Sequence, residues 1–197
     1  MREMSSGLYD LYEIKLRLGI YEQDYEQLKL YVDKMFEAWR YITNKKYSSF
    51  LKNYAGIVKR FFLDYSKERG GVEPYFYLLC LRERKDFDVT EEYKRKIEEV
   101  KLQNDTNTRW FTAWGNAIKT CLPISVSINH LEEKEAIENE INVFCTNERY
   151  TLNPIVDDEK KELLKNVCGS GRHNLVTFLG KFKELNRQLS VGCNDGN

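Results

Sequence analysis

The chain lacks the features that mark several broad classes of protein. It has only 3 prolines and 11 glycines in 197 residues, which argues against collagenous and disordered chains. It contains no run of about 18 apolar residues, so no membrane-spanning helix is predicted. Its first residues are polar and the next segment is interrupted by charges, so no secretory signal is expected. This length suits one domain of ordinary size or two small ones.

Residues for metal or nucleophilic chemistry are also scarce. There are two histidines, His130 and His173, and five cysteines with no Cys-x-x-Cys pair. An odd number of widely spaced cysteines is typical of buried thiols in a reducing compartment rather than of a disulfide framework. Cys168 and His173 have a Cys-x4-His spacing, but they lack the paired knuckle of structural zinc sites. We therefore expect a cytoplasmic protein with no metal, no other cofactor and no catalytic residues.

What the chain does have is an apolar fraction of 42% and a helical period within it. Apolar side chains recur every three or four residues over 21–43 and over 47–67, which predicts an amphipathic helix in each range. Weaker patterns predict further helices over 8–18, 74–85, 88–100, 110–121, 131–145, 157–167 and 174–189. Residues 104–108 are polar and are expected to form a loop. Residues 124–128 alternate weakly, as a short strand would, but helical signals dominate on both sides.

These patterns predict an all-α fold, a compact bundle of about seven to eight mostly antiparallel helices. Residues 1–190 are expected to form a single domain, and a sub-boundary at 146–156 stays open. Residues 191–197 are expected to be a frayed tail.

Two tryptophans in the middle of the chain are four residues apart. Trp110 and Trp114 would share one face of a helix. The simpler interpretation is that both pack in the core. An exposed aromatic patch would instead mark a site for a partner.

A block of basic residues without acidic ones stands out at 40–60 in a chain of net charge zero. On a helix over 47–67, its cations would lie opposite the apolar face and could follow a phosphate backbone. The candidate residues are Lys45, Lys46, Lys52, Lys59, Arg60 and Lys67. The alternative is a solvated face, or a face paired with the acidic residues of 131–140.

A second basic set lies near the C-terminal end. The candidate residues are Arg172, Lys181, Lys183 and Arg187, on or just before the helix expected over 174–189. Backbone amides at the start of such a helix, beside Arg172, could hold a phosphate. An ordinary helical hairpin that buries its apolar side chains is the competing interpretation.

The sequence thus favours a non-enzymatic protein that acts by binding a macromolecule. A protein partner is preferred, because a net charge near zero is unusual for a dedicated nucleic-acid binder. The alternative is a nucleic-acid-binding module, associated with replication or defence, that uses a basic helix face on DNA or RNA. Neither a membrane nor a small-molecule substrate is indicated.

Overall fold

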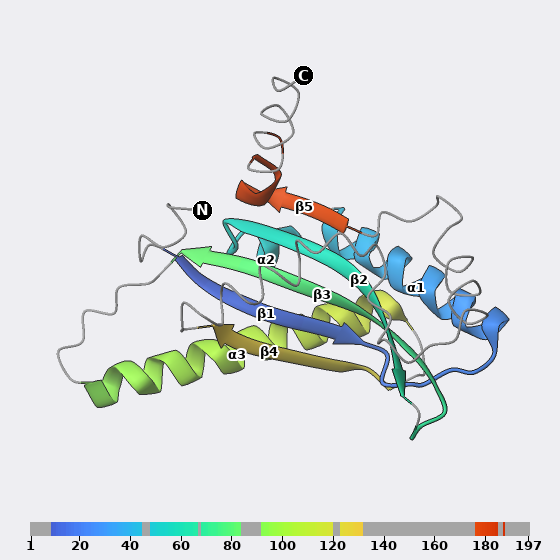
Figure 1. Cartoon of the computed structure of the whole chain (residues 1–197). Helices are drawn as coiled ribbons and strands as arrows, with labels where there is room; N and C mark the ends of the chain where they lie inside the picture. The colour runs from blue at the N-terminus through green and yellow to red at the C-terminus, as the bar shows by residue number, and fades with distance from the viewer. Residues whose placement is uncertain are drawn as a thin grey trace, which may run out of the picture.

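The computed structural model describes residues 9–44, 48–66, 68–83, 92–119, 123–131, 176–184 and 187. These residues form a five-stranded antiparallel sheet and two main helices (Figure 1). The prediction of an all-α bundle is therefore wrong. The predicted helices over 131–145 and 157–167, the sub-boundary at 146–156 and the tail at 191–197 lie outside the described residues, apart from Leu131.

The elements follow one another in the order strand, helix, one-turn helix, strand, strand, helix, strand, strand. They are β1 (Tyr9–Arg17), α1 (Tyr25–Thr43), the single turn α2 (Ser48–Leu51), β2 (Gly56–Ser66), β3 (Gly71–Glu83), α3 (Glu92–Ile118), β4 (Ser125–Leu131) and β5 (Val176–Gly180). The strand order across the sheet is β4-β1-β3-β2-β5. Without α2 and β5, this is the ferredoxin-like arrangement of two interleaved β-α-β units.

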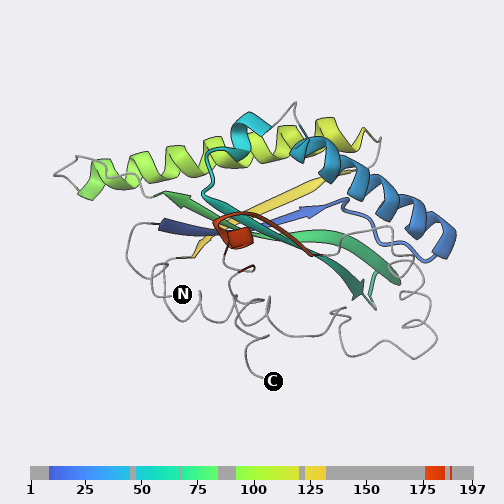
Figure 2. The same cartoon turned by 90° about the horizontal axis from the view of Figure 1, so that it is seen from above.

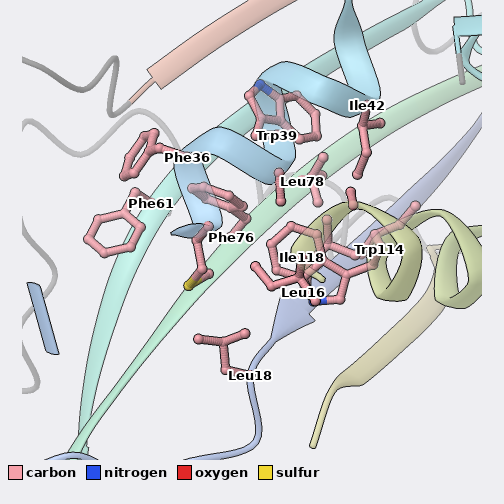
Figure 3. Close-up of a cluster of buried hydrophobic side chains, with 14 of the residues drawn as sticks. Leu16, Leu18, Phe36, Trp39, Ile42, Phe61, Phe76, Leu78, Trp114 and Ile118 are labelled. Carbon is pink, nitrogen blue, oxygen red and sulfur yellow. The ribbon is translucent and has the colours of Figure 1, made fainter. Parts of the chain in front are cut away.

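Both long helices lie on one side of the sheet (Figure 2). We call this side the helix face and the opposite side the outer face. The core between sheet and helices is rich in aromatic rings, with Phe36 and Trp39 from α1, Phe61 from β2 and Phe76 from β3 (Figure 3). Trp114 of α3 is fully buried, and its indole nitrogen donates a hydrogen bond to the carbonyl of Arg17 at 3.0 Å.

Trp110 is fully buried as well. Its indole nitrogen donates a hydrogen bond to the Tyr54 hydroxyl at 2.8 Å, and its ring packs edge-on against Phe50. The interpretation of both tryptophans as core residues is confirmed.

Several predicted helices are strands, and in β1, β2 and β3 the buried apolar residues face both sides of the sheet. The ranges 8–18, 47–67 and 74–85 hold β1, β2 and β3, and 174–189 holds β5 followed by helical residues at 181–184. In β2 every residue from Gly56 to Leu63 is buried. A strand buried on both faces shows an apolar run without alternation, so helical spacings can be found within it by chance. The enrichment in aromatic and β-branched residues was the signal for strands.

The helix predicted over 21–43 is confirmed, and the structure shows it from Tyr25 to Thr43. Its N-cap, Asp24, accepts hydrogen bonds from the amides of Glu26 and Gln27 at 2.8 and 3.1 Å. This cap satisfies donors that have no partner inside the helix. The apolar stripe and the cap agree, which is why this element was predictable.

The loop predicted over 104–108 is instead the middle of α3. Thr106 and Thr108 donate hydroxyl hydrogen bonds to the carbonyls of Leu102 and Asn104, one turn earlier, at 2.7 and 2.9 Å. Their side chains thus bond within the helix rather than compete with it. The weakly alternating residues at 124–128 belong to β4.

One charged residue lies inside the aromatic core. Lys59 of β2 has no exposed surface, and its ammonium nitrogen lies 4.4 Å from the ring centre of Phe36 and 4.5 Å from that of Phe76. Burial lowers the pKa of Lys59 from 10.5 to about 7. The ring faces favour the charged form and offset part of the desolvation cost.

This burial predicts a stability that rises with pH. Above pH 7 the folded chain releases the Lys59 proton while the unfolded chain keeps it until its pKa near 10.5. The unfolded state then binds more protons, so unfolding becomes harder as pH rises. We expect the free energy of unfolding, measured by urea denaturation, to increase by roughly 2 kcal/mol from pH 6.5 to pH 9.

The variant Lys59→Met should flatten this rise and should be more stable than the wild type at pH 6.5. The exposed Lys52 provides the matched control, since Lys52→Met should keep the wild-type pH dependence. Equal pH profiles for Lys59→Met and the wild type would contradict a buried titrating lysine.

Candidate functional site

Among the described residues, the most distinctive group of charged and aromatic side chains lies on the outer face along β1, β3 and β2, where Arg60, Phe62 and Tyr77 are buried. In β1 the side chains of Glu13, Lys15 and Arg17 point to the outer face, because Ile14 and Leu16 between them are in the core. Strand pairing extends these positions into two rows across the sheet. One row is Ser127, Lys15, Tyr77 and Arg60, and the next is Ser125, Arg17, Tyr75 and Phe62.

Each row brings cations onto aromatic rings. The guanidinium carbon of Arg17 lies 4.7 Å from the ring centre of Tyr75, and the Lys15 nitrogen lies 5.3 Å from that of Tyr77. The Arg60 guanidinium lies 5.1 Å from the Phe62 ring centre. The rings of Phe62 and Tyr75 stack at 5.4 Å with planes 15° apart. These eight positions form a mixed aromatic and cationic platform, which we call the aromatic–cation platform.

Buried carboxylates hold the two cations of β1 in place. Arg17 Nη1 lies 2.5 Å from Glu73 Oε2, and Lys15 Nζ lies 2.5 Å from Glu13 Oε1. Glu73 is 2% exposed, whereas the side chains of Arg17 and Lys15 remain 26% and 29% exposed. Asn129 of β4 also donates a hydrogen bond to Glu13, at 2.9 Å. Each cation is thus held by a carboxylate, while part of its side chain remains exposed to solvent.

Tyr75 of the platform has a shifted pKa. Burial, with the negative charge of Asp64 as the next cause, raises the pKa of Tyr75 to about 12. Tyr75 therefore stays a neutral phenol and offers a ring face and a hydroxyl rather than a negative charge. This state favours contact with anions beside Arg17.

Toward the other end of the strands the outer face becomes apolar. Leu11, Val58, Leu79 and Leu81 form a second buried cluster, and Phe178 of β5 packs against it. Lys181, directly after β5, lies over the ring of Tyr9 at 4.6 Å. The outer face therefore has an apolar half beside the aromatic–cation platform.

The structure does not bring the predicted basic residues together as one row, because the helix over 47–67 that would carry them is absent. Lys59 is inside the core and Arg60, its neighbour, belongs to the platform. Lys52 is exposed in the turn after α2. The exposed residues Lys181 and Lys183 directly follow β5, and Arg187 is exposed. Lys45, Lys46, Lys67 and Arg172 lie outside the described residues.

Sequence reasoning missed the main residues of the platform, namely Lys15, Arg17, Tyr75 and Tyr77. Their signal is a spacing of two, Lys-x-Arg and Tyr-x-Tyr, which places both members of each pair on one face of a strand. That signal was overlooked because both segments were interpreted as helices.

A cavity lies between α2, the end of β3 and the middle of α3. It is a cavity of about 210 Å³ lined by Asn53, Tyr54, Arg82, Asp105 and Arg109, among others. Its cations are engaged locally, since Arg82 donates to Thr106 at 3.2 Å and Arg109 pairs with Asp105 at 2.9 Å. Burial raises the pKa of Tyr54, so its hydroxyl stays protonated. This cavity is a weaker candidate than the outer face.

Metal and thiol chemistry find little support in the part of the chain that the structure describes. Within it, no group of three or more His, Cys, Asp and Glu side chains is placed to hold a metal ion. Cys80 is buried with a free thiol, and burial raises its pKa well above the usual range. No helix among these residues is long and apolar enough to cross a membrane.

Comparison with known proteins returned no matching family model, no similar curated protein and no similar solved structure.

The buried pair of Arg17 and Glu73 leads to a stability prediction. Glu73→Gln keeps the shape but removes the charge that balances Arg17, so we expect a loss of roughly 1–3 kcal/mol in the free energy of unfolding. The matched control is Glu98→Gln, which breaks an exposed pair with Lys101 on α3 and should cost less than about 0.5 kcal/mol. Urea denaturation of both variants at pH 7 measures the difference. Equal losses would show that the Glu73 pair does not stabilise the sheet.

Proposed function

We propose that this protein binds single-stranded nucleic acid on the aromatic–cation platform. The observation that carries the proposal is Tyr75 on the central strand, which is partly exposed and has the guanidinium of Arg17 over its ring. A partly exposed aromatic ring on a sheet offers a stacking surface for an unpaired base. The adjacent cations offer contacts to phosphates.

The topology adds an analogy. RNA-recognition motifs also use a four-stranded sheet whose aromatic side chains stack on bases. In this chain the same strand order, β4-β1-β3-β2, places the partly exposed ring of Tyr75 on the central strand β3, where it stacks on the buried ring of Phe62 from β2. The analogy concerns fold alone and assigns no family.

The carboxylates beside the platform, Glu13 and Glu73, reduce the positive charge that its cations can offer to a phosphate. Arg17 has five N–H donors in a planar fork, and its contact with Glu73 leaves others for a phosphate. Lys15 shares its ammonium with Glu13. Because the cations are already partly neutralised, we expect moderate affinity that falls steeply with salt.

A net charge of zero fits such a local site, because distance and screening make the nearest charges decisive. The preference for a protein partner that the composition suggested stays a prediction. It would gain if a single protein were recovered stoichiometrically with the wild type and lost with platform variants.

Removing a stacking ring should weaken binding. We expect Tyr75→Leu to raise the Kd for a fluorescein-labelled 12-nucleotide single strand by about 5-fold or more, since stacking on one base is worth about 1–3 kcal/mol. Fluorescence anisotropy at about 50 mM salt measures the Kd for DNA and for RNA. The control Phe111→Leu removes an exposed ring from α3 on the other side of the molecule and should leave the Kd unchanged.

Removing a phosphate contact should have a different signature. Arg17→Gln should raise the Kd and lower the slope of log Kd against log salt by about 0.7, the value for one phosphate contact on a single strand. Lys101→Gln on α3 is the matched control and should change neither quantity. If the wild type binds no oligonucleotide at low salt, or if Lys101→Gln weakens binding as much as Arg17→Gln, the platform is not a nucleic-acid site.

A further inference from the structure

The cavity between α2, the end of β3 and the middle of α3 is separate from the aromatic–cation platform. Arg82, which lines it, lies on the side of β3 that also carries Phe76 and Leu78, so the cavity belongs to the helix face. There α2 lies beside α3, and Phe50 packs edge-on against Trp110 (Figure 2). The cavity can therefore bind a ligand independently of the function proposed for the outer face.

Arg82 brings a positive charge to the cavity that no carboxylate balances among the described residues. Within that part of the chain its hydrogen bond goes from Nη1 to the hydroxyl of Thr106 at 3.2 Å, and this hydroxyl is neutral. Asp10 is opposite Arg82 in the pairing of β1 with β3, but its carboxylate lies 3.5 Å from Nε2 of His130. A guanidinium has five N–H donors, so most of those of Arg82 remain available.

Two further hydrogen-bond donors line the same cavity. The Tyr54 oxygen accepts a hydrogen bond from the Trp110 indole nitrogen at 2.8 Å, which leaves the hydroxyl hydrogen for another acceptor. Burial raises the pKa of Tyr54, although the charge of Arg82 acts in the opposite direction, so the hydroxyl stays protonated near neutral pH. Asn53, exposed in the turn after α2, adds a side-chain amide.

The other charged residues of the cavity balance each other. Arg109 Nε lies 2.9 Å from Asp105 Oδ2, one turn earlier on α3. Since two arginines and one aspartate line the cavity, one positive charge remains, that of Arg82. Water can accept hydrogen bonds from these donors, but it does not balance a half-buried charge. A ligand with a single negative charge does both.

A small carboxylate has the size and charge that these groups require. The cavity of about 210 Å³ is smaller than the pockets of about 300–1,000 Å³ that hold drug-sized ligands. A carboxylate carries one negative charge, and its two oxygens match the planar fork of a guanidinium. A phosphate monoester carries about −1.5 to −2 charges at pH 7, more than Arg82 alone balances. Phe50 and Leu102 provide apolar contacts for a short hydrocarbon chain.

We propose that this cavity binds a small carboxylate, whose oxygens accept hydrogen bonds from Arg82, Tyr54 and Asn53. Thr106 holds the guanidinium of Arg82 from the side of α3. The ligand would join α2, β3 and α3 through these contacts. Because it binds only the folded chain, it should also raise the temperature of unfolding.

The tryptophan indole groups allow a direct test by nuclear magnetic resonance in the isotope-labelled full chain. The indole N–H of Trp110 bonds to Tyr54 and should shift on binding, whereas that of Trp114 bonds to the carbonyl of Arg17 and should not. Propionate is the probe, compared at pH 7 and constant ionic strength with uncharged propionamide and with methyl phosphate. We expect a saturable shift of the Trp110 signal, with a Kd for propionate at least about 10-fold lower than for either comparison compound.

Variants locate the binding. Arg82→Gln should raise the Kd for propionate by at least about 10-fold, because the ligand loses a charge-assisted hydrogen bond. Arg40→Gln removes the same charge from the exposed surface of α1 and should leave the Kd unchanged. If Arg82→Gln does not fold, as judged by circular dichroism, Asn53→Ala replaces it and should raise the Kd by about 3-fold, since a neutral hydrogen bond is lost.

Several results would overturn the proposal. They are the absence of a saturable Trp110 shift, equal shifts of Trp110 and Trp114, and binding of propionamide or methyl phosphate as tight as that of propionate. An unchanged Kd in Arg82→Gln, or in Asn53→Ala where that variant replaces it, would do so as well.

Discussion

The whole arrangement depends on the packing of both long helices against one ring, Phe76 of β3. Its ring centre lies 5.0 Å from that of Phe36 in α1 and 5.9 Å from that of Trp114 in α3. Phe61 of β2 approaches it to 5.9 Å. These contacts hold both α1 and α3 on the helix face. The residues of β1, β2 and β3 whose side chains point the other way therefore form the separate outer face. Tyr75 and Tyr77 flank Phe76 in sequence and belong to that surface for this reason.

The period of two in a strand also divides the basic block at 40–60. Lys59 points into the aromatic core, where burial lowers its pKa to about 7, and Arg60 points to the outer face. The basic block, which looks like one charged patch in the sequence, thus places side chains in two different environments, the aromatic core and the outer face. The aromatic–cation platform gains its remaining cations from β1, far away in sequence, where Arg17 and Lys15 are oriented by buried carboxylates.

Sequence reasoning succeeded where one face of an element meets water and its end is capped, as in the helix that begins at Tyr25. It also placed Trp110 and Trp114 in the core correctly. It failed for β2 and β3, because side chains on both faces of these strands are buried and the alternation that identifies a strand disappears. The platform was missed with them, since Tyr75 and Tyr77 share a face only if the segment is extended.

The sequence by itself determined the local features: the stripe and cap of α1, the apolar content of the core, and the alternating pairs Lys15 with Arg17 and Tyr75 with Tyr77. Only the tertiary structure decided that the apolar runs are strands, and which side of the sheet each cation reaches. The physical reason is that a strand is stabilised by hydrogen bonds to partners distant in sequence. Lys15 pairs with Tyr77 across the sheet, and no local pattern records that choice of partner.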